Sequence, residues 1–107
     1  MKILAVDDDN AVRISLKVMF RKWDHLELEV AEDAKNALEK LATTEYIMMF
    51  CDIDMPGMNG LELLKIVKEK YPLMPVVMLT GNQDIKAPIQ AFRDGAMDYL
   101  QKPMQTA

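Results

Sequence analysis

Short apolar stretches alternate with stretches of helical periodicity along the chain. The apolar stretches predict strands, and apolar residues spaced three or four apart in the intervening stretches predict amphipathic helices. The predicted strands cover residues 2–6, 26–30, 46–51, 75–80 and 97–100. The predicted helices lie within residues 10–23, 33–42, 60–70 and 84–94. The pattern is therefore a β-α unit repeated four times, followed by a last strand.

This alternation indicates an α/β fold with a doubly wound sheet. Strands that are apolar throughout are typical of a parallel sheet covered by helices on both faces. Right-handed crossovers then predict five strands in the flavodoxin-like order 2-1-3-4-5. Residues 26–30 read LELEV, and their polar face suits the edge position of strand 2. We expect a single domain over residues 1–107.

Pro88 constrains the fourth predicted helix. A proline in a helix interior removes a hydrogen bond and clashes with the preceding turn, at a cost of ~3 kcal/mol, but it is tolerated in the first turn. We therefore expect this helix to begin near Ala87, with Ile85, Ile89 and Phe92 in register as apolar positions. Gly95 suits the end of the helix.

Composition and charge exclude several classes of protein. Of 107 residues, 50% are hydrophobic and 28% charged, which is ordinary for a globular domain. The net charge of −4, without a basic stripe, argues against direct nucleic-acid binding. Cys51 has no second cysteine to pair with, and no apolar run approaches the ~18 residues of a membrane span. We expect a soluble, cytoplasmic protein without membrane insertion.

Aspartates follow two of the apolar strands. Residues 7–9 follow the first strand, and Asp52 and Asp54 come at the end of the third. Those two strands flank the point where strand order reverses, and ligands of such sheets bind beyond the strands' carboxyl ends. Two carboxylates 4 Å apart repel by about 4 kcal/mol at an effective dielectric of 20, so the cluster binds either protons or a cation. Oxygen ligands suit Mg²⁺, whereas His25 and Cys51 are single and offer no zinc site.

The remaining polar residues at this rim suit phosphoryl transfer. A carboxylate beside a divalent ion can act as a nucleophile and form an aspartyl phosphate. The transfer needs stabilisation of charge on the phosphoryl oxygens, for which Lys102 can form an ion pair and Thr80 can donate a hydrogen bond. Gly57, Gly60 and Gly81 leave the backbone free to approach closely.

Four motifs in this order resemble the receiver domain of two-component response regulators, almost from end to end. They read ILAVDDD, DIDMPGMNG, VVMLTG and GAMDYLQKP. The resemblance implies that Asp52 is phosphorylated by a histidine kinase, and that Asp7 and Asp8 recruit Mg²⁺, or Mn²⁺ in its place. It also implies a conformational switch that controls an output domain or protein. Self-phosphorylation and autodephosphorylation are the only reactions that it implies.

The same resemblance assigns further residues. The backbone carbonyl of Asp54 is implied as a metal ligand, and Lys102 as the residue that binds the phosphoryl group. Thr80, which also contacts that group, forms the switch pair with Tyr99. The peptide between Lys102 and Pro103 resembles a cis peptide of the family.

The chain departs from the family after Pro103, where a fifth helix normally follows. Residues 104–107 read MQTA, too short for a stable helix. We expect this helix to be missing or truncated, either because the chain is a fragment of a longer regulator or because it ends early. The flank formed by the fourth helix and fifth strand would then expose apolar surface and favour a homo-oligomer.

Other interpretations of the same residues stay open. A degenerate receiver that binds partners without phosphate would carry the same motifs. A phosphatase of the haloacid dehalogenase type also uses Asp-x-Asp, with Asp54 as general acid, but places it on the first strand. A calcium-binding loop fails, because Pro56 and Leu63 stand where ligands are required. Residues 7–9 alone would serve as a helix cap, and Tyr99 alone as a core residue.

Overall fold

The computed structural model of the chain describes residues 1–81 and 86–101, without the side chains of 86–88. Within these residues five parallel strands form one sheet in the order β2-β1-β3-β4-β5, as predicted. The elements are β1 Lys2–Val6, α1 Asn10–Phe20, β2 Glu27–Ala31, α2 Ala34–Thr43, β3 Met48–Asp52, α3 Gly60–Lys70, β4 Val76–Thr80, α4 Lys86–Arg93 and β5 Asp98–Gln101. Among the described residues, every helix is too short or too polar to cross a membrane.

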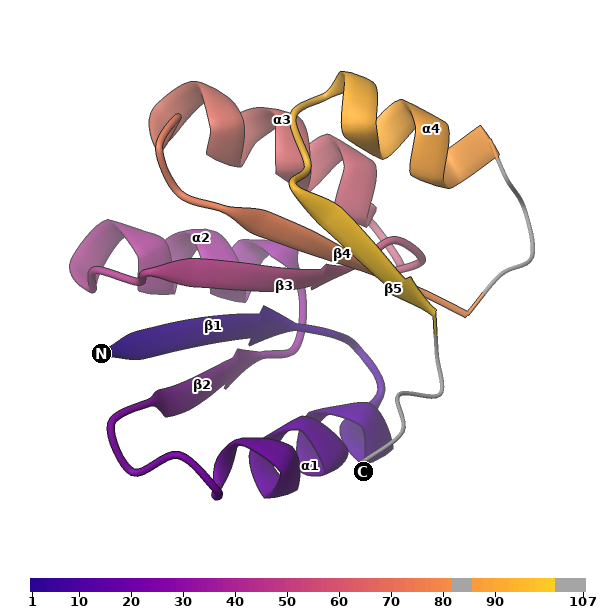
Figure 1. Cartoon of the computed structure of the whole chain (residues 1–107). Helices are drawn as coiled ribbons and strands as arrows, with labels where there is room; N and C mark the ends of the chain where they lie inside the picture. The colour runs from indigo at the N-terminus through magenta and orange to yellow at the C-terminus, as the bar shows by residue number, and fades with distance from the viewer. Residues whose placement is uncertain (82–85, 102–107) are drawn as a thin grey trace.

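The sheet is covered on both faces, which divides the core into two layers (Figure 1). Helices α2, α3 and α4 lie on one face, where Leu4 and Met78 pack with Leu64 of α3. Helix α1 lies on the other face, where Phe50 packs with Leu16. Because successive side chains of a strand point to opposite faces, one apolar strand supplies both layers. The central strands are therefore buried on both sides.

Local side-chain hydrogen bonds fix where the helices begin. The Asp9 carboxylate accepts a hydrogen bond from the Ala11 backbone N–H (2.9 Å) and caps α1. Asn59 and Glu62 form a reciprocal capping box at the start of α3. Such caps contribute about 1 kcal/mol each. They set the ends of the two loops that follow β1 and β3.

Helix α4 begins where Pro88 was expected to allow it. The helix runs from Lys86 to Arg93, which places the proline in its first turn. Gly95 follows the helix with φ +102°, and its N–H donates to the Phe92 carbonyl (3.2 Å). This left-handed conformation suits glycine, as predicted for the helix end.

The predicted apolar face of α4 is wrong. Ile89 and Phe92 are 50% and 45% exposed, whereas Ala91 is 1% exposed. The helix packs through its small residue, and the Phe92 ring lies edge-on to Tyr99 of β5, with centroids 5.7 Å apart. Spacing identified apolar positions but not the side that faces the core, and Ile85 lies outside the described residues.

The edge formed by α4 and β5 carries the exposed apolar surface that was expected. All four residues of β5 are exposed, and Tyr99 and Leu100 are among them. An interpretation of Tyr99 as a core residue is therefore wrong. The expected absence of a fifth helix concerns residues 102–107, which lie outside the described part of the chain.

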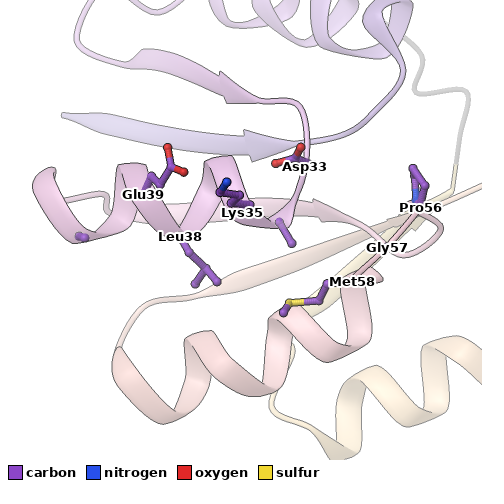
Figure 2. Close-up of a pocket in the computed structure, with 9 residues that line it drawn as sticks. Asp33, Lys35, Leu38, Glu39, Pro56, Gly57 and Met58 are labelled. Carbon is purple, nitrogen blue, oxygen red and sulfur yellow. The ribbon is translucent and has the colours of Figure 1, made fainter.

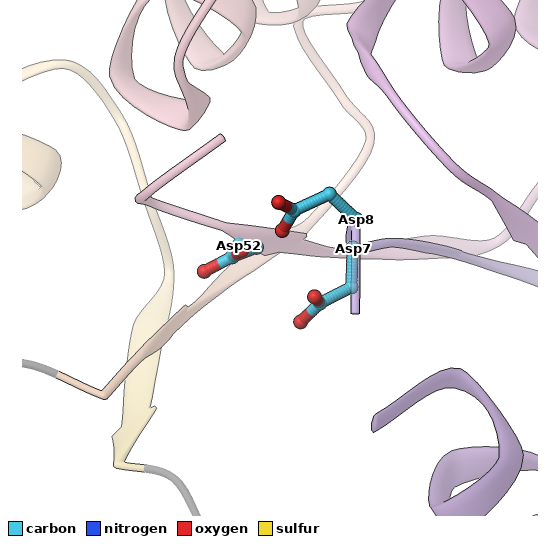
Figure 3. Close-up of side chains that lie close together, drawn as sticks. All are labelled: Asp7, Asp8 and Asp52. Carbon is cyan, nitrogen blue, oxygen red and sulfur yellow. The ribbon is translucent and has the colours of Figure 1, made fainter. Parts of the chain in front are cut away.

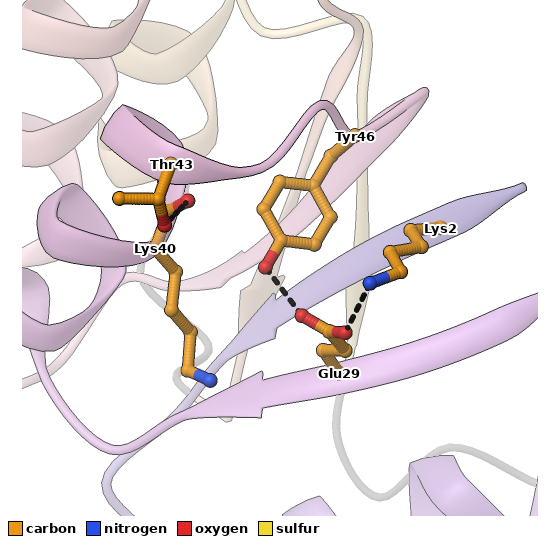
Figure 4. A network of polar contacts seen from close by, with 5 residues as sticks. All are labelled: Lys2, Glu29, Lys40, Thr43 and Tyr46. Carbon is orange, nitrogen blue, oxygen red and sulfur yellow. Dashed lines mark hydrogen bonds and ion pairs between the residues drawn. The ribbon is translucent and has the colours of Figure 1, made fainter.

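A polar network lies near the opposite end of the sheet from the aspartates (Figure 4). The Tyr46 hydroxyl donates to Glu29 (2.6 Å), and the Lys2 ammonium pairs with the same carboxylate (3.0 Å). The hydrogen bond from Tyr46, followed by that from Lys2, lowers the pKa of Glu29. Burial, followed by the Glu29 carboxylate, raises the pKa of Tyr46 to about 12. The network ties β1 and β2 to the segment that leads into β3.

Replacing Tyr46 by phenylalanine should lower the free energy of unfolding at pH 7 by about 1 kcal/mol, because the Glu29 carboxylate loses a donor. A depressed carboxyl pKa contributes stability above its ordinary value of 4.5, and this contribution is lost as the pH falls through the folded-state pKa. The difference between parent and variant, measured by urea unfolding, should therefore shrink below pH 4.5.

Tyr71→Phe is the matched control, because the Tyr71 hydroxyl donates to the uncharged Leu41 carbonyl (3.2 Å). Its cost should not change as the pH falls from 7 through the folded-state pKa of Glu29. A Tyr46→Phe difference that stays constant over this range would contradict the assignment to Glu29.

Candidate functional site

The carboxyl ends of β1 and β3 bring three aspartates together (Figure 3). The parallel register pairs Val6 with Cys51, so the next residue of each strand, Asp7 and Asp52, meets at the same edge. Asp8 follows in the loop. One carboxylate oxygen from each of the three residues lies within 4.8 Å of the others. The predicted acidic cluster thus forms from two segments far apart in sequence.

The cluster is only partly open to solvent. Asp7 is 0% exposed and Asp52 2%, whereas Asp8 is exposed. Unit negative charges at such separations repel by roughly 3–4 kcal/mol at an effective dielectric of 20. Burial raises the cost of keeping such charges close together. Among the described residues, the group consists of three carboxylates, and such hard oxygen donors fit a cation such as Mg²⁺ or Ca²⁺.

Hydrogen bonds hold the loop after β1 in place. The Asp7 backbone N–H donates to the Ala31 carbonyl of β2 (3.1 Å), and its Oδ1 accepts from the Asp9 N–H (2.8 Å). The Arg13 guanidinium, on α1, donates to the Asp7 carbonyl (2.6 Å). Asp7 is thus fixed through its N–H, its carbonyl and its side chain. Sequence reasoning did not identify Arg13, because its partner is a backbone carbonyl and the pattern of side chains carries no signal for such a contact.

The loop after β3 contains two glycines with different roles, and only Gly60 makes a close backbone approach. A Cβ atom built on Gly60 would lie 1.9 Å from the Asp52 carbonyl oxygen, so only glycine fits there. Gly57 has φ +75°, a left-handed conformation that glycine adopts without strain. The Asp54 N–H donates to the Asp52 carboxylate (3.3 Å). For Gly81, which is exposed directly after β4, close approach stays a prediction.

Comparison with known families identifies this arrangement. A family model, the response regulator receiver domain, matches residues 3–107. The chain belongs to this family. Recognition from the four sequence motifs is therefore confirmed.

Curated relatives include a transcriptional regulator and a response regulator protein. The chain is 39% identical to the DNA-binding transcriptional regulator NtrC of Proteus hauseri over 94% of its own length and 21% of the relative. It is 36% identical to the response regulator protein FleR of Pseudomonas aeruginosa, over 97% of its own length and 22% of that protein. The chain thus spans about a fifth of the length of these curated relatives.

Solved receiver structures share the fold. The receiver domain of NtrX from Brucella abortus has a TM-score of 0.90 and 34% identity, covering 97% of this chain and 88% of that one. The chemotaxis protein CheY4 of Vibrio cholerae has a TM-score of 0.91 and 30% identity, covering 98% and 88%. Both likenesses extend over nearly the whole receiver domain.

Two further predicted residues lie on neighbouring strands of the receiver. Thr80 ends β4 and is 1% exposed, and its register partner on β5 is Gln101. Tyr99 is 40% exposed and lies beside Phe92 rather than in the core. Lys102 lies outside the described residues, so its role stays a prediction, as do the switch role of Thr80 and Tyr99 and the part of the Asp54 carbonyl.

A separate groove lies beside the β3–α3 loop of the receiver (Figure 2). It has a volume of about 660 Å³ and runs between α2 and residues 56–58. Half-buried Leu38 and Met58 line it, and exposed Lys35 and Glu39 lie at its edge. None of the three clustered carboxylates is among its lining residues, so it adjoins the acidic cluster without being part of it.

Gly60→Ala should destabilise the domain by about 3 kcal/mol, because the added methyl group meets backbone rather than a movable side chain. Urea unfolding measures this loss. Gly57→Ala is the comparison, since its Cβ would meet nothing within 4 Å and only the left-handed backbone is strained. It should cost about 1 kcal/mol. Equal losses in the two variants would contradict the close approach at Gly60.

Proposed function

We propose that this domain takes a phosphoryl group from a histidine kinase onto Asp52 and, when phosphorylated, changes its contacts with an output domain or protein. The observation that carries the proposal is the meeting of Asp7, Asp8 and Asp52 within 4.8 Å at the carboxyl edge of the sheet. A nearly buried carboxylate next to a set of cation ligands has the chemistry of a phosphoryl acceptor.

In the proposed reaction an oxygen of the Asp52 carboxylate attacks the phosphorus of the kinase's phosphohistidine. The phosphorus–nitrogen bond breaks, and its electron pair returns to the imidazole. The Thr80 hydroxyl donates to one phosphoryl oxygen and the Lys102 ammonium pairs with another. The carboxylates of Asp7, Asp8 and Asp52 and the carbonyl of Asp54 would hold Mg²⁺, and the bound ion would supply positive charge next to the phosphoryl oxygens.

The proposed switch passes from Asp52 to the α4–β5 edge. A phosphoryl group adds roughly −1.5 to −2 of charge. Thr80 turns toward this charge, and Tyr99 on the neighbouring strand moves into the space that Thr80 leaves. The group shifts the conformational population only as far as it stabilises one state more than the other. An output domain or a second receiver would then bind the changed surface with a different affinity.

Incubation with acetyl phosphate and Mg²⁺ tests the acceptor. Intact-mass measurement should find one added phosphoryl group per chain, with none in Asp52→Asn and none in the absence of Mg²⁺. Asp54→Asn is the matched control, because it removes a carboxylate from the same loop and should keep the added mass.

An adduct that persists in Asp52→Asn would disprove the assignment of the acceptor. Absence of any adduct in the parent would favour the phosphate-independent binding module. Continued turnover of a phosphomonoester, in place of a stoichiometric reaction, would favour the phosphatase.

Phe92→Asp tests self-association through the α4–β5 edge. Light scattering of the parent should show a mass that rises with protein concentration. The variant should associate roughly tenfold more weakly, because a charge replaces an exposed apolar ring. Ile14→Asp alters a similarly exposed apolar residue on α1 and should behave as the parent does. A parent that stays monomeric at high concentration would contradict this part of the proposal.

A further inference from the structure

Arg13 contacts the peptide that joins two residues of the acidic cluster. Its Nη1 donates to the Asp7 carbonyl oxygen at 2.6 Å, and its Nη2 donates to the Asn10 side-chain oxygen at 3.3 Å. The side chain is half-buried. The planar guanidinium therefore bridges the end of β1 and the first residue of α1, with two donors in a fixed geometry.

The contact between Arg13 and the Asp7 carbonyl affects the orientation of Asp8. The Asp7 carbonyl belongs to the peptide plane whose nitrogen is that of Asp8. Fixing the carbonyl therefore fixes the direction in which the chain leaves β1 and enters Asp8. Asp7 has further anchors in Ala31 and Asp9, whereas the exposed Asp8 depends on the peptide plane before it.

We infer that Arg13 is a positioning residue for the cation site, which holds the Asp7–Asp8 peptide so that both carboxylates face Asp52. The inference rests on the proposed function, because it takes the acidic cluster to be a Mg²⁺ site. It assigns a task to a basic residue outside the set of ligands. Hydrogen-bonding partners of metal ligands typically change metal affinity 10- to 100-fold when they are removed.

Because Arg13 is positively charged, its removal changes Mg²⁺ affinity in a direction that distinguishes two roles. A cation beside the cluster repels a second cation, so a guanidinium that acted through its charge alone would weaken Mg²⁺ binding. Its removal would then tighten binding. A positioning guanidinium predicts the reverse, because the carboxylates lose their common orientation when it is removed. The two roles therefore predict opposite changes for one substitution.

The experiment is a Mg²⁺ titration of the parent, Arg13→Met and Arg13→Lys, followed by amide chemical shifts in ¹H–¹⁵N spectra. The spectra report the dissociation constant and also whether each variant is folded. Arg13→Met should bind Mg²⁺ at least tenfold more weakly than the parent. Arg13→Lys keeps the charge but loses the planar fork, and should lie between the two. Lys17→Met, which removes an exposed cation one turn further along α1, should bind at least as tightly as the parent.

Equal or tighter binding by Arg13→Met would overturn the inference, and so would a lysine variant that matches the parent. If both Arg13 variants are unfolded, the Mg²⁺ affinity of Asn10→Ala tests the inference instead. This substitution leaves the bond to Asp7 in place and removes the second anchor of the guanidinium. A two- to threefold weaker affinity would support positioning, and an unchanged affinity would overturn it. A parent that binds no Mg²⁺ would instead disprove the proposed function.

Discussion

Repulsion between carboxylates at the ends of two adjacent buried strands is the constraint on which the rest of the site depends. Asp7 and Asp52 are nearly inaccessible and sit next to each other because β1 and β3 are parallel and in register. The apolar strands fix this arrangement, since a one-residue slip would exchange the side chains of the two core layers and disrupt the packing of both. The fold thus holds like charges together by burying the strands that carry them, and a bound cation would offset the repulsion.

Carboxylates near the two ends of the sheet lie in different electrostatic surroundings. Near the amino end of β1, the Lys2 cation and the Tyr46 hydroxyl compensate Glu29, and the pKa of that carboxyl is lowered. At the carboxyl end, one carboxylate oxygen from each of three aspartates lies within 4.8 Å of the others, and the hydrogen bonds around Asp7 orient the chain. The first arrangement stabilises the fold at neutral pH, whereas the second gathers negative charge at the proposed cation site.

The sequence was sufficient to predict the sheet and the acidic cluster because both follow from the chain's apolar strands. Parallel strands must carry their carboxyl ends to one edge, so Asp7 and Asp52 meet whatever the loops do. Apolar spacing did not predict which side of α4 faces the core. Ala91 has less apolar area to bury than Ile89 or Phe92, but its small side chain lets the helix pack closely on the core. Arg13 was missed for a related reason: its partner is a backbone carbonyl, which leaves no trace in the pattern of side chains.

The exposed α4–β5 edge lies close to the acidic cluster, so a structural change at Asp52 has only a short path to it. Asp52 on β3 pairs with Leu79 on β4, and Met78, the preceding residue of β4, pairs with Tyr99 on β5. Only one strand therefore separates the proposed acceptor from the exposed ring pair of Tyr99 and Phe92. Reversing a 1:99 population takes about 5.5 kcal/mol. Repulsions of 3–4 kcal/mol between close carboxylates are of the same order. A change of charge at Asp52 is thus of the same order as the proposed switch, and it drives the switch only by the part of that energy that differs between the two states.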